Sequence, residues 1–179
     1  MKGLIFTEFL AFLREQGGES LAEGIIEAAG VEGTYSGVGT YDVGELEALV
    51  GSACERLDLT RDQGLRMFGE WVFSSLAASY GTMLEHISGT FDLLRVLDRV
   101  IHVEVRKLDH LAELPSFDVL VDTPDRMELH YSSTRRMSAL ALGLMRGCIA
   151  YFGEELDATI ISTSEDGQEA TFVVQRKAA

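Results

Sequence analysis

The sequence predicts an α+β fold, with an N-terminal helical part packed on a C-terminal part that holds a four-stranded antiparallel sheet and helices. Two observations predict it. Apolar residues recur about every 3.6 positions as far as about residue 108, and the period then falls to about 2. The segments with the shorter period form two pairs, with an amphipathic helix between them. Residues 1–179 show no repeat and no linker, so we expect a single domain.

Helices in the first part are predicted by apolar stripes and by start and stop signals. The glycines Gly17–Gly18 and Gly30 are expected to end the first two helices. Thr60 and Gln63 form a capping box that opens a later helix. A stretch rich in Gly, Ser and Thr, residues 32–41, is expected to be a loop. The expected helices cover about residues 2–16, 20–29, 43–58, 60–79 and 90–108.

The second part is predicted to contain two hairpins. Alternating patterns at 118–122 and 126–131 form the first, and 156–164 with 170–175 form the second, whose turn is Asp166–Gly167. Between them, residues 136–152 carry the clearest amphipathic helix pattern of the chain, ended by Gly153.

Composition and charge exclude several classes of protein. The chain is 46% apolar and 25% charged, which is typical of a soluble globular protein, and it has no apolar run of membrane-spanning length. Its net charge of −14 repels phosphate backbones, so we expect no nucleic-acid partner. The apolar start lacks a cleavage site, so we expect a cytoplasmic protein. Cys54 and Cys148 lie on apolar helical stripes and are expected to be free core thiols.

His102 is the histidine with the most suggestive position. It lies inside an amphipathic helix, in VIHVEV, where a histidine can be a partly buried residue held by a hydrogen bond. It can also be the axial ligand of a heme iron, because the porphyrin supplies the four equatorial ligands. HExxH and HxxEH spacings are absent, which argues against a zinc protease.

A second set of polar residues is Tyr131, Ser133 and Arg135. If the strand continues through them, these alternate positions share one side and offer hydroxyl and guanidinium donors to a carboxylate. The alternative is a strand end, a helix cap and a surface arginine. GxSxG, P-loop and paired catalytic carboxylates are not found, so we expect the protein not to be an enzyme.

These two features together resemble the H-NOX family, the heme nitric oxide/oxygen binding domains related to the heme domain of soluble guanylate cyclase. His102 is followed about thirty residues later by Tyr131-x-Ser133-x-Arg135, and the likeness covers nearly the whole chain. Segments that match in order and spacing are MKGLIFTEFL, GTYDVGELEALVG, FGEWVFSSLAASY, RVIHVEVRKL and ELPSF.

The resemblance implies heme b as cofactor, held between the helical part and the part with the sheet. His102 would then be the iron ligand, and Tyr131, Ser133 and Arg135 would hold the propionates. Two other positions match family residues that bend the porphyrin, namely Ile5 and Pro115.

The resemblance also bears on which gas binds. Oxygen-binding members carry a distal tyrosine where this chain has Leu140, and a partly negative bound oxygen needs such a donor. The positions matching the rest of the pocket are also apolar: Phe9, Val72, Phe73 and Leu144. We therefore expect nitric oxide as the ligand, with carbon monoxide possible and oxygen disfavoured. An oxygen or redox sensor, or a heme-free adaptor, is the alternative.

The family mechanism implies a switch in which NO weakens or breaks the Fe–His102 bond and the heme relaxes. No output domain follows about residue 176, so we expect a separate output protein, either a histidine kinase or a cyclic-di-GMP enzyme. We expect no membrane partner. Many NO-sensing relatives have a cysteine-rich zinc site near the C-terminus, and the matching stretches here contain no cysteine, so a structural zinc is not expected.

Overall fold

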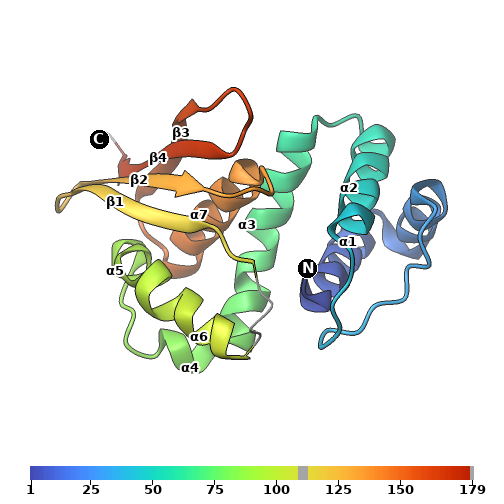
Figure 1. The fold of residues 1–179 in the computed structure, drawn as a ribbon, viewed down its shortest axis with the longest axis horizontal. Helices are drawn as coiled ribbons and strands as arrows, with labels where there is room; N and C mark the ends of the chain where they lie inside the picture. The colour runs from blue at the N-terminus through green and yellow to red at the C-terminus, as the bar shows by residue number, and fades with distance from the viewer. Residues whose placement is uncertain (109–112, 178–179) are drawn as a thin grey trace. The chain divides into compact units, whose positions relative to one another are not determined.

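The computed structural model describes residues 1–108 and 113–177. The chain divides into two compact units, Met1–Phe68 and Gly69–Ala179 (Figure 1). The expectation of a single domain stays a prediction.

Unit 1 contains two helices and the start of a third. These are α1 (Gly3–Ala29), α2 (Val43–Leu57) and α3 (Arg61–Ser79), of which α3 continues into unit 2. The predicted break in α1 is confirmed, because Gly17 and Gly18 have non-helical backbone angles, with φ of 77° at Gly18. The capping box is also confirmed. The Thr60 N–H donates to Gln63 Oε1 at 2.8 Å, and the Gln63 N–H donates to Thr60 Oγ1 at 3.2 Å.

The predicted loop between α1 and α2 returns to the start of α1. The Met1 amine donates to the Tyr41 carbonyl at 2.6 Å, and the Gly3 N–H donates to the Gly39 carbonyl at 2.9 Å. A Cβ at Gly3 would clash with the Ser36 carbonyl oxygen, so only glycine permits this close approach. The loop therefore holds the first turn of α1, which carries Ile5.

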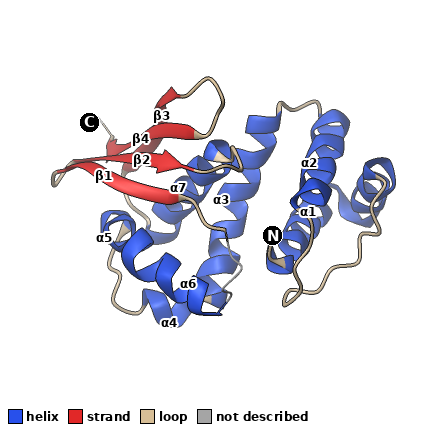
Figure 2. Ribbon diagram, in the orientation of Figure 1, coloured by secondary structure: helices blue, strands red, loops and turns tan. Residues whose placement is uncertain are grey.

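Unit 2 contains the predicted sheet. Its strands are β1 (Ser116–Asp122), β2 (Arg126–Ser132), β3 (Leu156–Thr163) and β4 (Glu169–Arg176), in the antiparallel order β1-β2-β4-β3 (Figure 2). Both predicted hairpins are confirmed. Alternate β2 residues Met127, Leu129 and Tyr131 are buried, and α7 (Ser138–Phe152) packs against β3 and β4. One face of the sheet is thus covered by the helix between the two hairpins.

Two helix predictions for unit 2 need correction. The segment expected as one helix is α5 (Thr90–Val96), a π-helical turn η1 (Leu97–Ile101) and α6 (His102–Leu108), preceded by the short α4 (Gly81–Leu84). The helix expected from residue 136 begins at Ser138, because Arg136 has a left-handed φ of 54°. Neither departure has a signature in apolar periodicity, which reports the face that a residue occupies and not local backbone angles.

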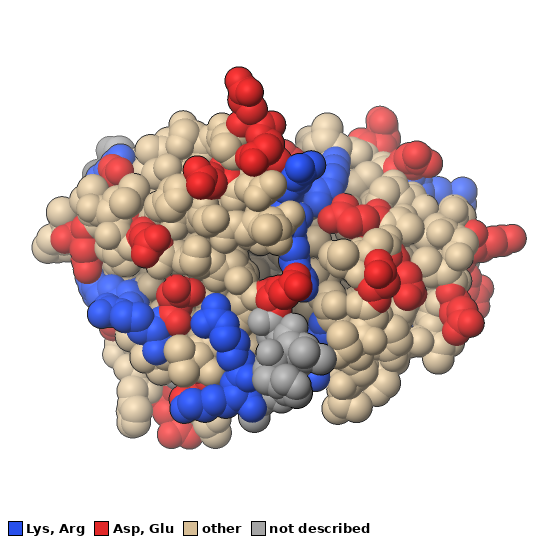
Figure 3. Space-filling model, viewed as in Figure 1, with Lys and Arg blue, Asp and Glu red and all other residues tan. Residues whose placement is uncertain are grey.

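Charge is unevenly distributed on the surface. The chain carries a net charge of −14, yet Lys and Arg side chains gather over α5 and α6 in Figure 3. Arg99, Arg106 and Lys107 are exposed in this segment. Within the described residues, no helix is both long and apolar enough to cross a membrane.

Candidate functional site

His102 lies at the start of α6, directly after the π-helical turn. The backbone N–H of His102 donates to the carbonyl of Leu97, five residues earlier, and this is the hydrogen bond that defines a π-helix. His102 is 8% exposed as a whole, and its ring Nδ1 lies 2.9 Å from Oδ1 of Asp98. Burial lowers the pKa of His102, while the hydrogen bond to Asp98 opposes that shift. Burial therefore favours the neutral form of His102, which is the form that binds metal ions.

Aromatic side chains connect His102 to β1 and β2. The ring centroids of His102 and Phe117 are 6.1 Å apart, and those of Phe117 and Tyr131 are 5.4 Å apart. The backbone of Pro115 also lies close enough to the His102 ring to raise its pKa, against the effect of burial. The structure thus brings three of the predicted site residues, His102, Pro115 and Tyr131, into one region of unit 2.

The strand does not continue through the Tyr131-x-Ser133-x-Arg135 motif, contrary to expectation. β2 ends at Ser132, and a turn follows at Thr134 and Arg135, so strand alternation does not place the last two motif residues. The turn joins them by another route, since the Arg135 N–H donates to Ser133 Oγ at 3.2 Å. The helix cap that was the alternative is also not found, because α7 starts without a side-chain cap at Met137.

The Arg135 guanidinium is largely buried and only partly paired. Its side chain is 17% exposed, and one terminal nitrogen lies 3.1 Å from the exposed carboxylate of Glu113. Its Nε has no hydrogen-bond partner, the only such buried side-chain atom within residues 1–108 and 113–177. A buried donor without a partner costs about 1–3 kcal/mol or more when the group is charged, so its presence points to an acceptor that binds there.

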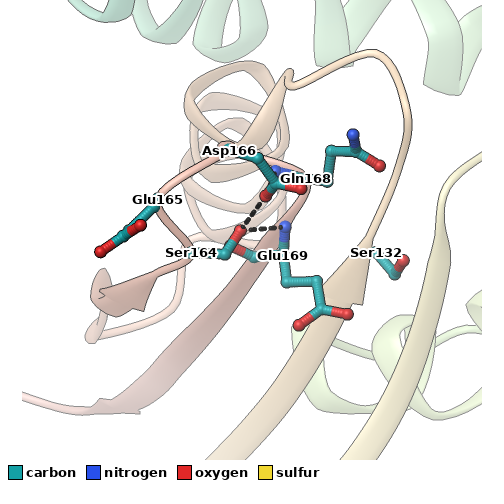
Figure 4. A pocket seen from close by; sticks show the side chains of 6 residues that line it. All are labelled: Ser132, Ser164, Glu165, Asp166, Gln168 and Glu169. Atoms are coloured by element: carbon teal, nitrogen blue, oxygen red, sulfur yellow. Dashed lines mark hydrogen bonds between the residues drawn. The ribbon is translucent and has the colours of Figure 1, made fainter.

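The turn between β3 and β4 is hydrogen-bonded to this motif. The Ser133 N–H donates to the Gln168 carbonyl at 2.8 Å. Asp166 Oδ1 in turn accepts from Ser164 Oγ at 2.7 Å and from the Gln168 N–H at 3.0 Å. Figure 4 shows this turn beside the end of β2, around an open polar depression that also includes Ser132. Because the depression is open and polar, it does not have the character of a porphyrin pocket.

The apolar residues predicted for the site lie in both units. In unit 2, Phe73 and Leu144 pack in one cluster with Leu93 and Cys148, while Val72 is buried and Leu140 is half-buried. In unit 1, Phe9 packs edge-on against Phe68, with ring centroids 5.0 Å apart, and Ile5 is half-buried. The predicted apolar character is therefore present, and the roles of these side chains stay predictions.

Two residues near His102 were missed in the sequence. Asp98 precedes His102 by four positions, a spacing that places both side chains on one side of a helix and could have been noticed. Phe117 lies in the ELPSF segment, but nothing in the sequence indicates that its ring lies beside His102.

This set of donors fits a heme. A buried imidazole suits the iron, and a buried guanidinium whose Nε has no partner suits a carboxylate. The other histidines are less suited, because His86 is exposed, His130 is half-buried on β2, and His110 lies outside the described residues. No three His, Cys, Asp or Glu side chains gather as a metal site in the part of the chain that the structure describes.

Comparison with known proteins gives consistent matches over the whole chain. A family model described as Haem-NO-binding matches residues 2–160. The unliganded Fe(II) H-NOX protein of K. algicida is 32% identical, with a TM-score of 0.92 over 100% of this chain and 98% of that one. The S. oneidensis H-NOX protein in the Fe(II)NO state is 24% identical, with a TM-score of 0.91 over 99% and 100%. A variant of the T. tengcongensis H-NOX protein is 20% identical, with a TM-score of 0.87 over 99% and 98%. No curated protein matches.

Proposed function

The chain belongs to the Haem-NO-binding (H-NOX) family of heme-binding gas-sensor domains, and from that premise we propose that it binds heme b through His102 and senses nitric oxide. The observation that carries the proposal is the buried Arg135 Nε without a partner, in the same unit as a buried histidine. A propionate would supply the missing acceptor, and a charge-assisted hydrogen bond of this kind is stronger than a neutral one.

The proposed roles follow the chemistry of the side chains. His102 offers a ring nitrogen to the iron, and Arg135 and Ser133 offer donors to the propionates, with the Tyr131 hydroxyl as a third donor. Ile5 and Pro115 are proposed to press on the porphyrin. The pocket walls are proposed to come from the apolar set Phe9, Val72, Phe73, Leu140 and Leu144.

Selectivity for NO is proposed to come from the lack of a donor in these walls. Leu140 is proposed to stand where the oxygen-binding members of the family have a tyrosine, and Leu144 and Phe73 pack together in one apolar cluster. A pocket of this kind withholds the hydrogen bond that bound oxygen needs. Carbon monoxide, which needs no such donor, would still bind.

The signal is proposed to pass through the His102 segment. When bound, heme would supply an iron that can bind NO, and His102 would be the residue that holds this iron and is released when NO binds. Release of His102 frees α6 and the π-helical turn before it. A separate output protein, a histidine kinase or a cyclic-di-GMP enzyme, would then respond to whichever state it binds better. The domain itself is proposed to be a sensor without catalysis.

Absorption spectra of the reduced protein under argon, NO and air test this proposal. We expect a Soret band that shifts under NO and carbon monoxide and is unchanged when air is admitted briefly. The His102→Gly variant should lose the unliganded spectrum, and adding imidazole should restore it. His86→Gly, which changes an exposed histidine, is the matched control. A His102→Gly protein with an unchanged iron spectrum would refute the assignment.

A further inference from the structure

The π-helical turn before His102 carries one residue of a contact that the mechanism above does not use. Asp98 is the second residue of this turn, and its Oδ1 lies 2.9 Å from His102 Nδ1. π-helical turns are rare and occur often at functional sites, because they change the direction of the side chains that follow. Here the irregular backbone and the carboxylate–imidazole contact occur in the same six residues.

Burial separates this contact from an ordinary surface ion pair. The side chains of His102 and Asp98 are 10% and 33% exposed, whereas those of Lys107 and Glu104 on the same helix are 64% and 41% exposed. Exposed pairs contribute little, because solvent screens them and side-chain entropy is lost. A carboxylate that contacts a buried imidazole therefore acts on the ring with much less screening.

We propose that Asp98 is the positioning residue for His102, accepting its Nδ1–H so that Nε2 is the ring nitrogen that binds the iron. This inference rests on the proposed function. The carboxylate fixes both the tautomer and the ring plane, and it makes His102 a stronger donor, as second-sphere carboxylates do for metal-bound histidines. Asp98 thereby opposes release of His102 and sets how readily the sensor switches.

Resonance Raman spectra of the ferrous heme-loaded protein measure this effect directly. We expect the iron–histidine stretching band to move to lower frequency in Asp98→Asn, which keeps the shape and loses the charge, and further in Asp98→Leu, which has no acceptor. Stopped-flow mixing with NO should show the band lost about 10-fold to 100-fold faster in Asp98→Leu, the factor by which removing such a partner typically weakens metal binding. Asp92→Asn is the matched control, since Asp92 pairs with Arg95 on α5 and is 48% exposed.

The outcomes separate the two proposals. A wild-type protein that binds heme without an iron–histidine band overturns the proposed function and this inference together. A wild-type band that neither Asp98 variant moves, in frequency or in its rate of loss, overturns only the inference. If Asp98→Leu does not fold, Asp98→Asn alone decides, because a general loss of stability does not shift a vibrational frequency, whereas loss of the carboxylate does.

Discussion

Two helical segments of unit 2 contrast in how regular they are. α7 runs without interruption from Ser138 to Phe152 and ends at Gly153 with a left-handed φ of 65°. The His102 segment, α5 to α6, is interrupted by the π-helical turn and leaves Val100 and Val103 exposed. Helices α5 and α7 contact each other, so the two segments differ in regularity although they pack in the same part of unit 2.

The contrast follows from what each segment has to bury. α7 buries apolar side chains, and its Gly147 lies close against α3. A regular helix places these residues on one face and so meets both requirements. The other segment buries an imidazole and gives it a carboxylate partner, which a regular apolar stripe does not provide. Departures from local rules are expected where function imposes a requirement that packing does not.

The largest expected effect comes from placing a polar group on α7, the regular and apolar helix of the two segments compared. Leu140→Tyr adds a hydroxyl donor at the position that we propose to match the tyrosine of oxygen-binding relatives. We expect the reduced variant to form a new, stable absorption spectrum in air, with oxygen affinity raised by roughly 10-fold to 100-fold from one charge-assisted hydrogen bond. Leu140→Phe, of similar size without the hydroxyl, should behave as wild type. Equal behaviour of the two variants in air would contradict the selectivity argument.

The converse change removes a polar group from the motif that follows β2. Arg135→Met keeps an unbranched side chain like the apolar stem of arginine and removes the guanidinium, including the Nε that has no partner. Hydrogen bonds to charged groups contribute about 1.5–3 kcal/mol, so heme should be lost to an excess of apomyoglobin roughly 10-fold to 100-fold faster. Arg136→Met is the control, because Arg136 is the exposed neighbour. Similar loss rates for both variants would argue against a propionate contact at Arg135.

The sequence predicted the fold wherever a regular pattern governs the structure. The break at Gly17–Gly18, the Thr60–Gln63 capping box and both hairpins were predicted because each depends on residues adjacent in the chain. The π-helical turn at Leu97–Ile101 was not, because its apolar residues still fit a helical stripe.

The site was predicted to a different degree. His102 and Arg135 came from motif spacing and family resemblance, and their own surroundings in the sequence did not distinguish them from ordinary residues. The reasoning from strand alternation was wrong after Ser132, because strand length depends on pairing with β4, whose partner residue there is Glu169. Phe117 was missed since ring contacts between distant segments are tertiary, whereas Asp98 could have been found by its spacing of four from His102.

A packing change in α7 tests the view that this helix is governed by close contact. A Cβ at Gly147 would lie 2.6 Å from Phe73 Cβ and 2.7 Å from the Glu70 carbonyl oxygen, both fixed by α3. Overpacking should outweigh the gain in helix propensity, so Gly147→Ala should lower the free energy of unfolding by roughly 1–2 kcal/mol in urea titrations. Gly51→Ala on α2, with no neighbouring atom within 4 Å, should stabilise slightly. A stabilised Gly147→Ala variant would show that α7 has room here.

An effect of similar size, visible only at high pH, concerns the thiol that α7 buries against α5. Cys148 Sγ donates to Thr90 Oγ1 at 3.6 Å, both residues are buried, and burial raises the pKa of Cys148 to about 12. An unfolded cysteine has a pKa of about 8.5, so above this pH the unfolded chain loses a proton that the folded chain keeps. The stabilisation is complete below about pH 8.5 and is lost as the pH rises toward 12.

The wild-type free energy of unfolding should therefore fall more steeply than that of Cys148→Ala between pH 8 and pH 10, by about 2 kcal/mol. Comparing slopes removes the cost of the cavity that the alanine leaves, since that cost is the same at both pH values. Cys54→Ala in α2 is the control for loss of a thiol, because burial also raises the pKa of Cys54 but less strongly. Parallel pH profiles for wild type and Cys148→Ala would mean that water reaches the Cys148 thiol between α5 and α7, so that burial does not raise its pKa.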